Sequence, residues 1–271
     1  MFKELIILTL SAASLTAATA QNSLKITSVD QLATGRQNVK VEATAEPQVF
    51  RVNGASSLYS KDSIAIDPAK RYRLSGKFRN ATPDKALRIS FGVNGMDERK
   101  RPISGGSVDA VPGTETELAA DFKGGDTVLK VKDASEWKKG RIPVFKVDAS
   151  GKLADLPNLN TEYITIKDIA INADNQYDVT MSSPLKQSYP AGTSVRQHES
   201  GQWFHFPALN VPLSGDWQEF EFVFNGESAS GSESGKWRKN TKSAGIAAYI
   251  NPGQVKDGVT ELKDLGLEEV Q

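Results

Sequence analysis

The chain of 271 residues has no cysteine, only two histidines, and no charge surplus of either sign, since 33 basic residues face 33 acidic ones. Without cysteine, neither a disulfide framework nor a lipid-modified N-terminal cysteine is available, so a hydrophobic core must stabilise the fold. The charge balance argues against nucleic-acid binding, which needs a basic surplus on one face. It also argues against electrostatic attachment to a membrane surface.

Long hydrophobic runs are missing except near the N-terminus. There Lys3 precedes a short apolar run, residues 5–10, and small residues end at Ala18 and Ala20. A basic start, a short apolar region and an Ala-x-Ala end are typical of a cleavable secretory signal, which predicts a signal peptide at residues 1–20. The alternative is a membrane anchor, but the run is far shorter than the ~20 residues that span a bilayer. We therefore expect a secreted or periplasmic bacterial protein without a membrane span.

Sustained helical periodicity with capping residues is also missing, and short alternating segments take its place. In residues 215–224, three phenylalanines at alternate positions, Phe220, Phe222 and Phe224, share one face of a strand. Three aromatic side chains on one face need an apolar layer opposite them, so we expect a central strand of a two-layer domain. The segment 71–79, which also alternates, is expected to supply that layer. The predicted fold class is all-β.

Four segments resemble a known family. They are DPAKRYRLSGKFR at residues 67–79, DWQEFEF at residues 216–222, TKSAGI at residues 241–246 and LKDLGLEEV at residues 262–270. In this order they resemble strands of the galactose-binding-like jelly-roll carbohydrate-binding modules, which occur in secreted polysaccharide-degrading systems. The resemblance covers roughly residues 24–112 and 200–271. It implies a jelly-roll β-sandwich and a polysaccharide or another glycan as partner.

The middle of the chain has a different pattern. It contains T-x-L-x-V-x-D-A-S at residues 127–135, W-x-x-G at residues 137–140 and P-L-x-x-x-Y-P-A-G-x-x-V at residues 184–195. This order resembles a small β-barrel module found in secreted and phage-tail proteins. We therefore expect residues 21–113 and 198–271 to form the sandwich, with residues 114–197 as an inserted small β domain, because loops accept long insertions at modest entropic cost. The alternative is one continuous large sandwich. An inserted domain should have its own core, containing Leu129, Val131, Ile164, Ile166 and Val179.

Catalytic and metal-binding motifs are scarce. The sequence has no Gly-x-Ser-x-Gly, His-Glu-x-x-His or phosphate-binding glycine-rich loop. His198 and His205 lack acidic partners at metal-ligand spacing, so we expect structural roles for both. The family resemblance allows a structural calcium ion, with Asp264 at the matching closing position, but residues 21–36 lack the usual acidic-glycine partner. We expect no cofactor and no enzymatic activity.

Sugar recognition would rest on aromatic side chains, because the C–H face of a pyranose stacks on a ring while its hydroxyls bind polar groups. Our candidates are Trp237 with the adjacent Arg238, together with Trp203 and Tyr249. Trp237 is the first choice, since it follows a loop rich in Ser and Gly and is expected to be exposed. The predicted function is that of an exported, non-catalytic carbohydrate-binding protein. The alternative is a structural or adhesive surface protein that uses the jelly roll as a scaffold. The sequence does not indicate an oligomeric state.

Overall fold

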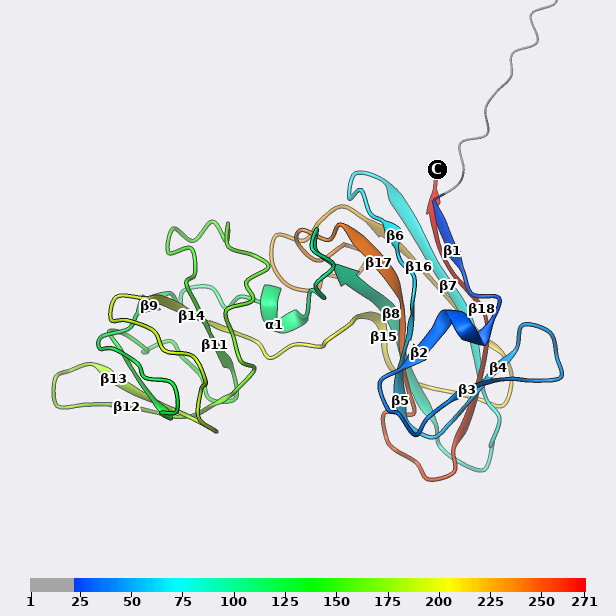
Figure 1. Cartoon of the computed structure of the whole chain (residues 1–271), viewed down its shortest axis with the longest axis horizontal. Coiled ribbons are helices and arrows are strands. Elements are labelled where there is room, and N and C mark those ends of the chain that lie inside the picture. Colours follow the sequence, from blue (N-terminus) through cyan, green and yellow to red (C-terminus); the bar gives the residue numbers. More distant parts are fainter. Residues whose placement is uncertain (1–21) are drawn as a thin grey trace, which may run out of the picture.

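The structure, a computed structural model, describes residues 22–271. The predicted signal peptide, residues 1–20, and the predicted new N-terminus at Gln21 lie outside the described residues. Helical structure in the described part is limited to α1 (Gly105–Val108) and a single 3-10 turn (Val29–Gln31), and every named strand pairs antiparallel (Figure 1). The predicted all-β fold class is confirmed.

Two sheets of six strands form a jelly-roll sandwich. Successive strands change sheets, as at β7 to β8 and β16 to β17 to β18. Sheet A has the order β16-β7-β18-β4-β3 with β1 paired to β18, and sheet B has the order β15-β8-β17-β5-β2 with β6 paired to β17. The strands of sheet A are β1 (Ser23–Lys25), β3 (Val41–Ala43), β4 (Phe50–Asn53), β7 (Arg71–Asn80), β16 (Gln218–Asn225) and β18 (Val259–Val270). Those of sheet B are β2 (Leu32–Thr34), β5 (Ser56–Ser60), β6 (Ile64–Ala65), β8 (Arg88–Met96), β15 (His205–Pro212) and β17 (Ser243–Ile250).

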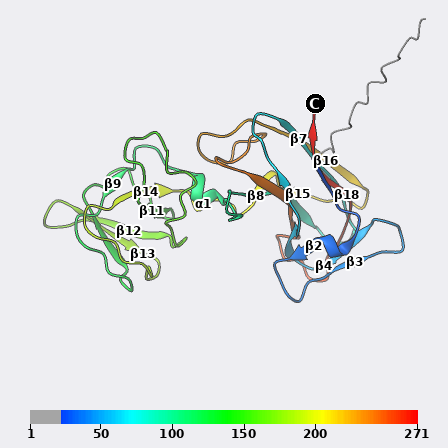
Figure 2. The ribbon, with the colours of Figure 1, turned by 45° about the horizontal axis from the view of Figure 1, so that its top comes forward.

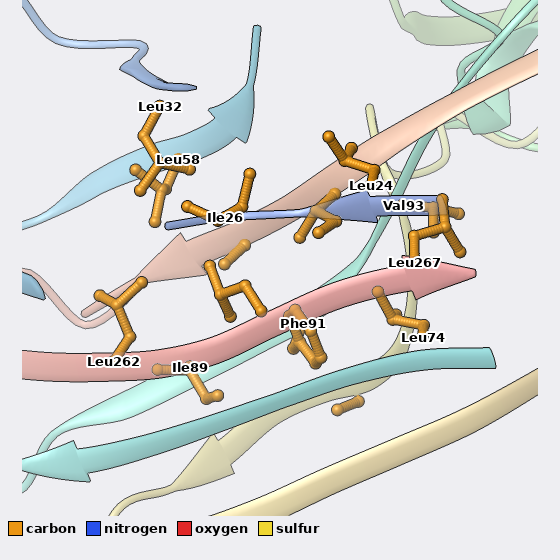
Figure 3. Packing of buried hydrophobic residues seen from close by; sticks show 14 of the residues in the cluster. Leu24, Ile26, Leu32, Leu58, Leu74, Ile89, Phe91, Val93, Leu262 and Leu267 are labelled. Carbon is orange, nitrogen blue, oxygen red and sulfur yellow. The ribbon is translucent and has the colours of Figure 1, made fainter. Parts of the chain in front are cut away.

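The sandwich core lies between the two sheets and is made of alternate residues of each strand. Figure 3 shows the packing of Leu74 and Leu267 from sheet A with Ile89, Phe91 and Val93 from sheet B. All five of these side chains are at most 1% exposed. Since the side chains of a strand alternate between its faces, the residues between them point outward, which leaves the outer faces free for other contacts.

The position of β16 differs from our prediction. This strand lies at the end of sheet A and pairs only with β7, where Phe222 faces Leu74 and Phe224 faces Tyr72. The predictions of a central strand, and of residues 71–79 as the opposite layer, are therefore wrong. The alternation of side chains reveals which face of a strand is apolar. Two strands that each have an apolar face can be hydrogen-bonded neighbours in one sheet, or they can face each other across the core from different sheets. The opposite layer comes from β8, whose Phe91 ring lies 6.3 Å from that of Phe220.

A second lobe, residues 116–198, lies beside the sandwich. It contains two three-stranded sheets, β11-β14-β9 and β10-β13-β12. Its strands are β9 (Thr116–Glu117), β10 (Val128–Val131), β11 (Ile142–Phe145), β12 (Ile166–Ile171), β13 (Tyr177–Met181) and β14 (Ser194–His198). Figures 1 and 2 both place α1 between this lobe and the sandwich.

The second lobe has a hydrophobic core of its own. As expected, this cluster includes Leu129, Val131, Ile166 and Val179, with Ile164 packed against it. Residues 94–207, all described, contribute nothing to the sandwich core cluster. The segment that enters the lobe and the segment that leaves it lie side by side, joined by an antiparallel β-bridge between Ala110 and His198. Independent folding of residues 114–197 as an inserted domain stays a prediction.

Candidate functional site

A cleft of about 570 Å³ lies on the outer face of sheet B. This volume falls within the roughly 300–1,000 Å³ of typical ligand-binding sites. Strand alternation explains its composition: Leu58 and Ile250 point into the core, so Ser57, Tyr59 and Tyr249 point outward. The cleft is lined by Ser57, Tyr59, Asn94, Pro102, Gln202, Trp203, Phe204, Phe206 and Tyr249.

Small residues at the centre of the sheet make this face concave. In the strand register, Ala247 of β17 lies between Tyr59 of β5 and Gly92 of β8. Gly92 allows a close approach of the backbone, because a Cβ atom there would lie 1.9 Å from the carbonyl oxygen of His205. Any side chain at this position would displace the start of β15. Gly92 thus sets the path of the segment that carries Trp203, Phe204 and Phe206.

Aromatic rings of three strands and one loop form the walls of the cleft. The ring centroid of Phe204 lies 6.3 Å from that of Tyr59 and 5.8 Å from that of Phe206. Trp203, which precedes Phe204 in the chain, is 53% exposed. With Tyr249, these side chains bring five aromatic rings to one site, next to the amides of Asn94 and Gln202 and the hydroxyl of Ser57. Apolar faces beside a few polar groups suit a ligand of mixed character.

The predicted ligand contact Arg238 is buried beneath this site, with 3% exposure. Its Nη1 donates to the carbonyl oxygens of Ile103 (2.6 Å) and Trp203 (2.9 Å), and its Nη2 donates to those of Gln202 (3.0 Å) and Phe204 (2.9 Å). Its Nε donates to Ser232 Oγ at 2.9 Å. A guanidinium has five N–H groups, and all five are occupied. Arg238 therefore positions the loop of residues 202–204 and has no donor left for a ligand.

Burial governs the ionisation of Arg238. Removal from water lowers its pKa to about 10, while the nearby carboxylate of Asp109 acts in the opposite direction. The side chain therefore stays charged at neutral pH, and its hydrogen bonds are charge-assisted. The same burial raises the pKa of Asp109.

Trp237, the first choice from the sequence, lies in the sandwich core and is 1% exposed. Its ring stacks on that of Phe224, with centroids 4.6 Å apart and planes 22° apart, and meets Tyr72 edge-on at 5.5 Å. The expectation that Trp237 is exposed is wrong. The physical reason is that the preceding loop returns to the sheet, since the backbone N–H of Trp237 donates to the carbonyl oxygen of Gly226 at 3.0 Å. This turn directs the indole inward.

Of the four candidates, the structure brings Trp203 and Tyr249 together and places Trp237 and Arg238 elsewhere. Sequence reasoning missed Tyr59, Phe204, Phe206 and Asn94. The signal for Tyr59 was present, because it follows the buried Leu58 and is a large aromatic at an outward position of a strand.

The two histidines are buried in packed surroundings, outside the lining of the cleft. His198 Nδ1 lies 2.9 Å from the carbonyl oxygen of Gly106, and burial together with Arg196 lowers its pKa to about 4. Burial likewise lowers the pKa of His205 to about 4, with its ring edge-on to Phe224 at 5.5 Å. Both imidazoles are neutral at pH 7.

Asp264, which the family resemblance matches to a calcium position, makes an ion pair with Lys77, whose Nζ lies 3.2 Å from Asp264 Oδ2. Asp264 adopts a left-handed backbone conformation (φ 54°), where the register of β18 against β7 shifts. Within residues 22–271, no three acidic, histidine or cysteine side chains gather to form a metal site. None of the helices in the described part of the chain has the length and apolar character needed to cross a membrane.

Comparisons with known proteins give weak similarities. No protein-family model matches the chain, and no curated protein matches it either. Among solved structures, the CBM22-1 xylan-binding domain of Xyn10C from Paenibacillus barcinonensis aligns with 10% identity and a TM-score of 0.36, over 94% of this chain and 99% of that domain. An arabinose-bound α-L-arabinofuranosidase, MgGH51, aligns with 7% identity and a TM-score of 0.34, over 92% of this chain and 25% of the enzyme. Similarities at these levels assign the chain to neither family.

Proposed function

We propose that this chain is an exported, non-catalytic carbohydrate-binding protein that holds a neutral glycan in the cleft on sheet B. The observation that carries the proposal is the meeting of five aromatic rings with uncharged hydrogen-bonding groups in one cleft. Rings such as Tyr59 and Tyr249 offer apolar faces to the C–H groups of a sugar. Asn94, Gln202 and Ser57 offer donors and acceptors to its hydroxyls.

The charge of the site supports a neutral ligand. No residue described as lining the cleft is charged. Two cations close to the cleft are engaged elsewhere: Arg238, beneath it, has all its donors occupied, and Arg101, next in sequence to the lining residue Pro102, pairs with Asp97 at 2.7 Å. Acidic sugars are bound most strongly by arginine and lysine. Affinity for a neutral glycan should therefore change little between low and high salt.

The lining also supports binding without catalysis. Most glycosidases use a pair of Asp or Glu side chains that flank the scissile bond. The described residues that line the cleft include neither acid. Incubation with xylan, β-glucan and β-mannan should accordingly release no reducing sugar, and measurable release would contradict this part of the proposal.

Binding is tested by affinity electrophoresis against neutral polysaccharides (xylan, β-glucan, β-mannan) and acidic ones (alginate, polygalacturonate). We expect retardation by at least one neutral polysaccharide and by neither acidic one. Tyr249→Ala should weaken that binding by at least about fivefold, because removing a ring that stacks on a ligand costs ~1 kcal/mol or more. The control is Val223→Ala, which truncates an exposed residue of sheet A, on the other side of the sandwich. Binding confined to the acidic polysaccharides would refute the proposal, and binding to a protein surface but to no glycan would favour the scaffold alternative.

A further inference from the structure

Two aromatic side chains meet where the second lobe touches the sandwich. Trp203, on the sandwich side, is 53% exposed, and Tyr163, from the second lobe, is 39% exposed. Their ring centroids are 5.9 Å apart, with planes inclined by 52°. They are the only exposed aromatic side chains of residues 22–271. Exposed aromatic surface that two separate chain segments bring into contact is a feature of binding sites.

The ring of Tyr163 and the backbone of Trp203 are both held in place. The hydroxyl of Tyr163 contacts the hydroxyl of Ser104. Its ring covers Gly106, where a Cβ atom would lie 2.6 Å from Tyr163 Cε1. The backbone of Tyr163 is left-handed (φ 57°), a conformation that costs energy for a bulky residue and therefore needs support from its surroundings. On the other side of the pair, the Trp203 carbonyl oxygen accepts from Arg238.

Direct hydrogen bonds also fasten the second lobe to the sandwich. Lys239 Nζ donates to the carbonyl oxygen of Leu153 at 2.7 Å, and Asn240 Nδ2 donates to that of Leu156 at 2.8 Å. The N–H of Asn158 donates to the carbonyl oxygen of Ser107, within α1, at 2.8 Å. On the lobe side all three bonds come from residues 153–158, and the contact of Tyr163 with Ser104 adds a second point of attachment, which fixes the orientation of the lobe as well as its distance. A ligand that reaches Trp203 therefore meets Tyr163 in a defined place.

We propose that Trp203 and Tyr163 form a second stacking position next to the cleft, so that a neutral glycan chain continues from the sandwich onto the second lobe. The inference rests on the proposed function and adds the length of the ligand to it. Trp203 lines the cleft and contacts Tyr163, so it is common to both positions. A disaccharide is held by the cleft alone, whereas a longer chain also stacks on the aromatic pair.

The test measures how affinity depends on chain length, by titration calorimetry with xylo-, cello- and manno-oligosaccharides from the disaccharide to the hexasaccharide. For the wild type, affinity should rise with length in the series that binds. Tyr163→Ala should lower hexasaccharide affinity about tenfold, the equivalent of one stacking contact, and leave disaccharide affinity unchanged. Tyr163→Phe, which keeps the ring and loses only the hydroxyl, should retain hexasaccharide binding. Ile171→Ala, an exposed truncation on the same lobe, is the matched control.

Several results would overturn the inference. If Tyr163→Ala binds the hexasaccharide as the wild type does, the pair is not a binding position. If it loses affinity for disaccharide and hexasaccharide equally, Tyr163 only orients Trp203, and the ligand does not extend onto the second lobe. A wild-type protein that binds none of the oligosaccharides or polysaccharides would overturn the proposed function itself, and the inference with it. Melting temperatures of all variants confirm that folded proteins are compared.

Discussion

Replacing Arg238 by lysine tests whether one buried guanidinium holds the loop that carries Trp203. Lysine keeps the positive charge but has three donors in place of five, on a single nitrogen that cannot span the fork of a guanidinium. At least two of the five acceptors now bonded to Arg238 therefore lose their partner. The change separates geometry from charge, because Asp109 still faces a cation.

The size of the effect follows from the acceptors left unpaired. A buried polar group without a partner costs about 1–3 kcal/mol, so two of them give roughly 2–6 kcal/mol. Gln202 and Trp203 are exposed residues, so water can replace part of the lost bonding at their carbonyl groups. We therefore expect Arg238→Lys to lower the free energy of unfolding by about 2–3 kcal/mol. The released loop should also weaken glycan binding, since Trp203 and Phe204 belong to the cleft.

The assay is urea denaturation of the wild type and the variant, followed by fluorescence and circular dichroism. The control is Lys236→Ala, which removes an exposed ion pair with Glu233 (2.8 Å). Such pairs contribute about 0–1 kcal/mol, so this variant should stay close to the wild type. If Arg238→Lys loses less than about 0.5 kcal/mol, the guanidinium is not what holds the loop, and the structural argument fails.

Four further predictions concern the core, the histidines, the second lobe and the signal peptide, the last resting on the sequence alone. Trp237→Ala should destabilise the protein by about 3–5 kcal/mol in urea denaturation, as expected for a buried tryptophan, and a loss below ~1 kcal/mol would contradict its position in the core. The folded-state pKa values of His198 and His205, about 4, lie below the ordinary value of 6.5. As the pH falls, the two histidines of the unfolded chain therefore take up protons before those of the folded protein. Their contribution to the free energy of unfolding is complete above pH 6.5 and should fall towards pH 4, by up to roughly 3 kcal/mol per histidine. Thermal melts of His205→Gln should show a smaller loss over this range, and an unchanged profile would refute the assignment. Replacing residues 114–197 by a short Gly/Ser linker should leave a folded sandwich by circular dichroism and limited proteolysis, whereas an unfolded product would show that the two parts form one cooperative unit. N-terminal sequencing of the exported protein should begin at Gln21, and retention of Met1 would refute the signal-peptide prediction.

The fold was accessible from the sequence because period-two patterns report burial directly. The alternation of Ile89, Phe91 and Val93 places all three in the core, where they are at most 1% exposed. The neighbours of each strand were not accessible by the same argument. Phe220 and Phe222 satisfied the pattern of a central strand, yet β16 ends sheet A, and both side chains are only partly buried. Pairing depends on long-range register, which a local pattern does not encode.

The candidate residues illustrate a second limit. Trp237 and Arg238 were chosen because they follow a Ser- and Gly-rich segment, which is typical of exposed loops. In the structure that segment is tied down, since the N–H of Gly231 and the hydroxyl of Ser230 both donate to the carbonyl oxygen of Val108. A polar composition indicates that a segment forms a loop, but it does not indicate whether the residues that follow the loop are exposed or buried. The two residues at its exit are therefore buried, one as core and one as a support for another loop.

The cleft itself depends on a combination that no single segment contains. Tyr59, Asn94 and Tyr249 come from β5, β8 and β17, strands distant in sequence that sheet B places side by side. Each was an outward-facing residue of an alternating strand, and outward polar or aromatic residues are common on any sandwich. What makes these a site is the small residue Ala247 between them and the close approach that Gly92 allows to β15. The small residues Gly92 and Ala247 are therefore as important for the cleft as the aromatic ones, since they determine where the aromatic side chains can gather.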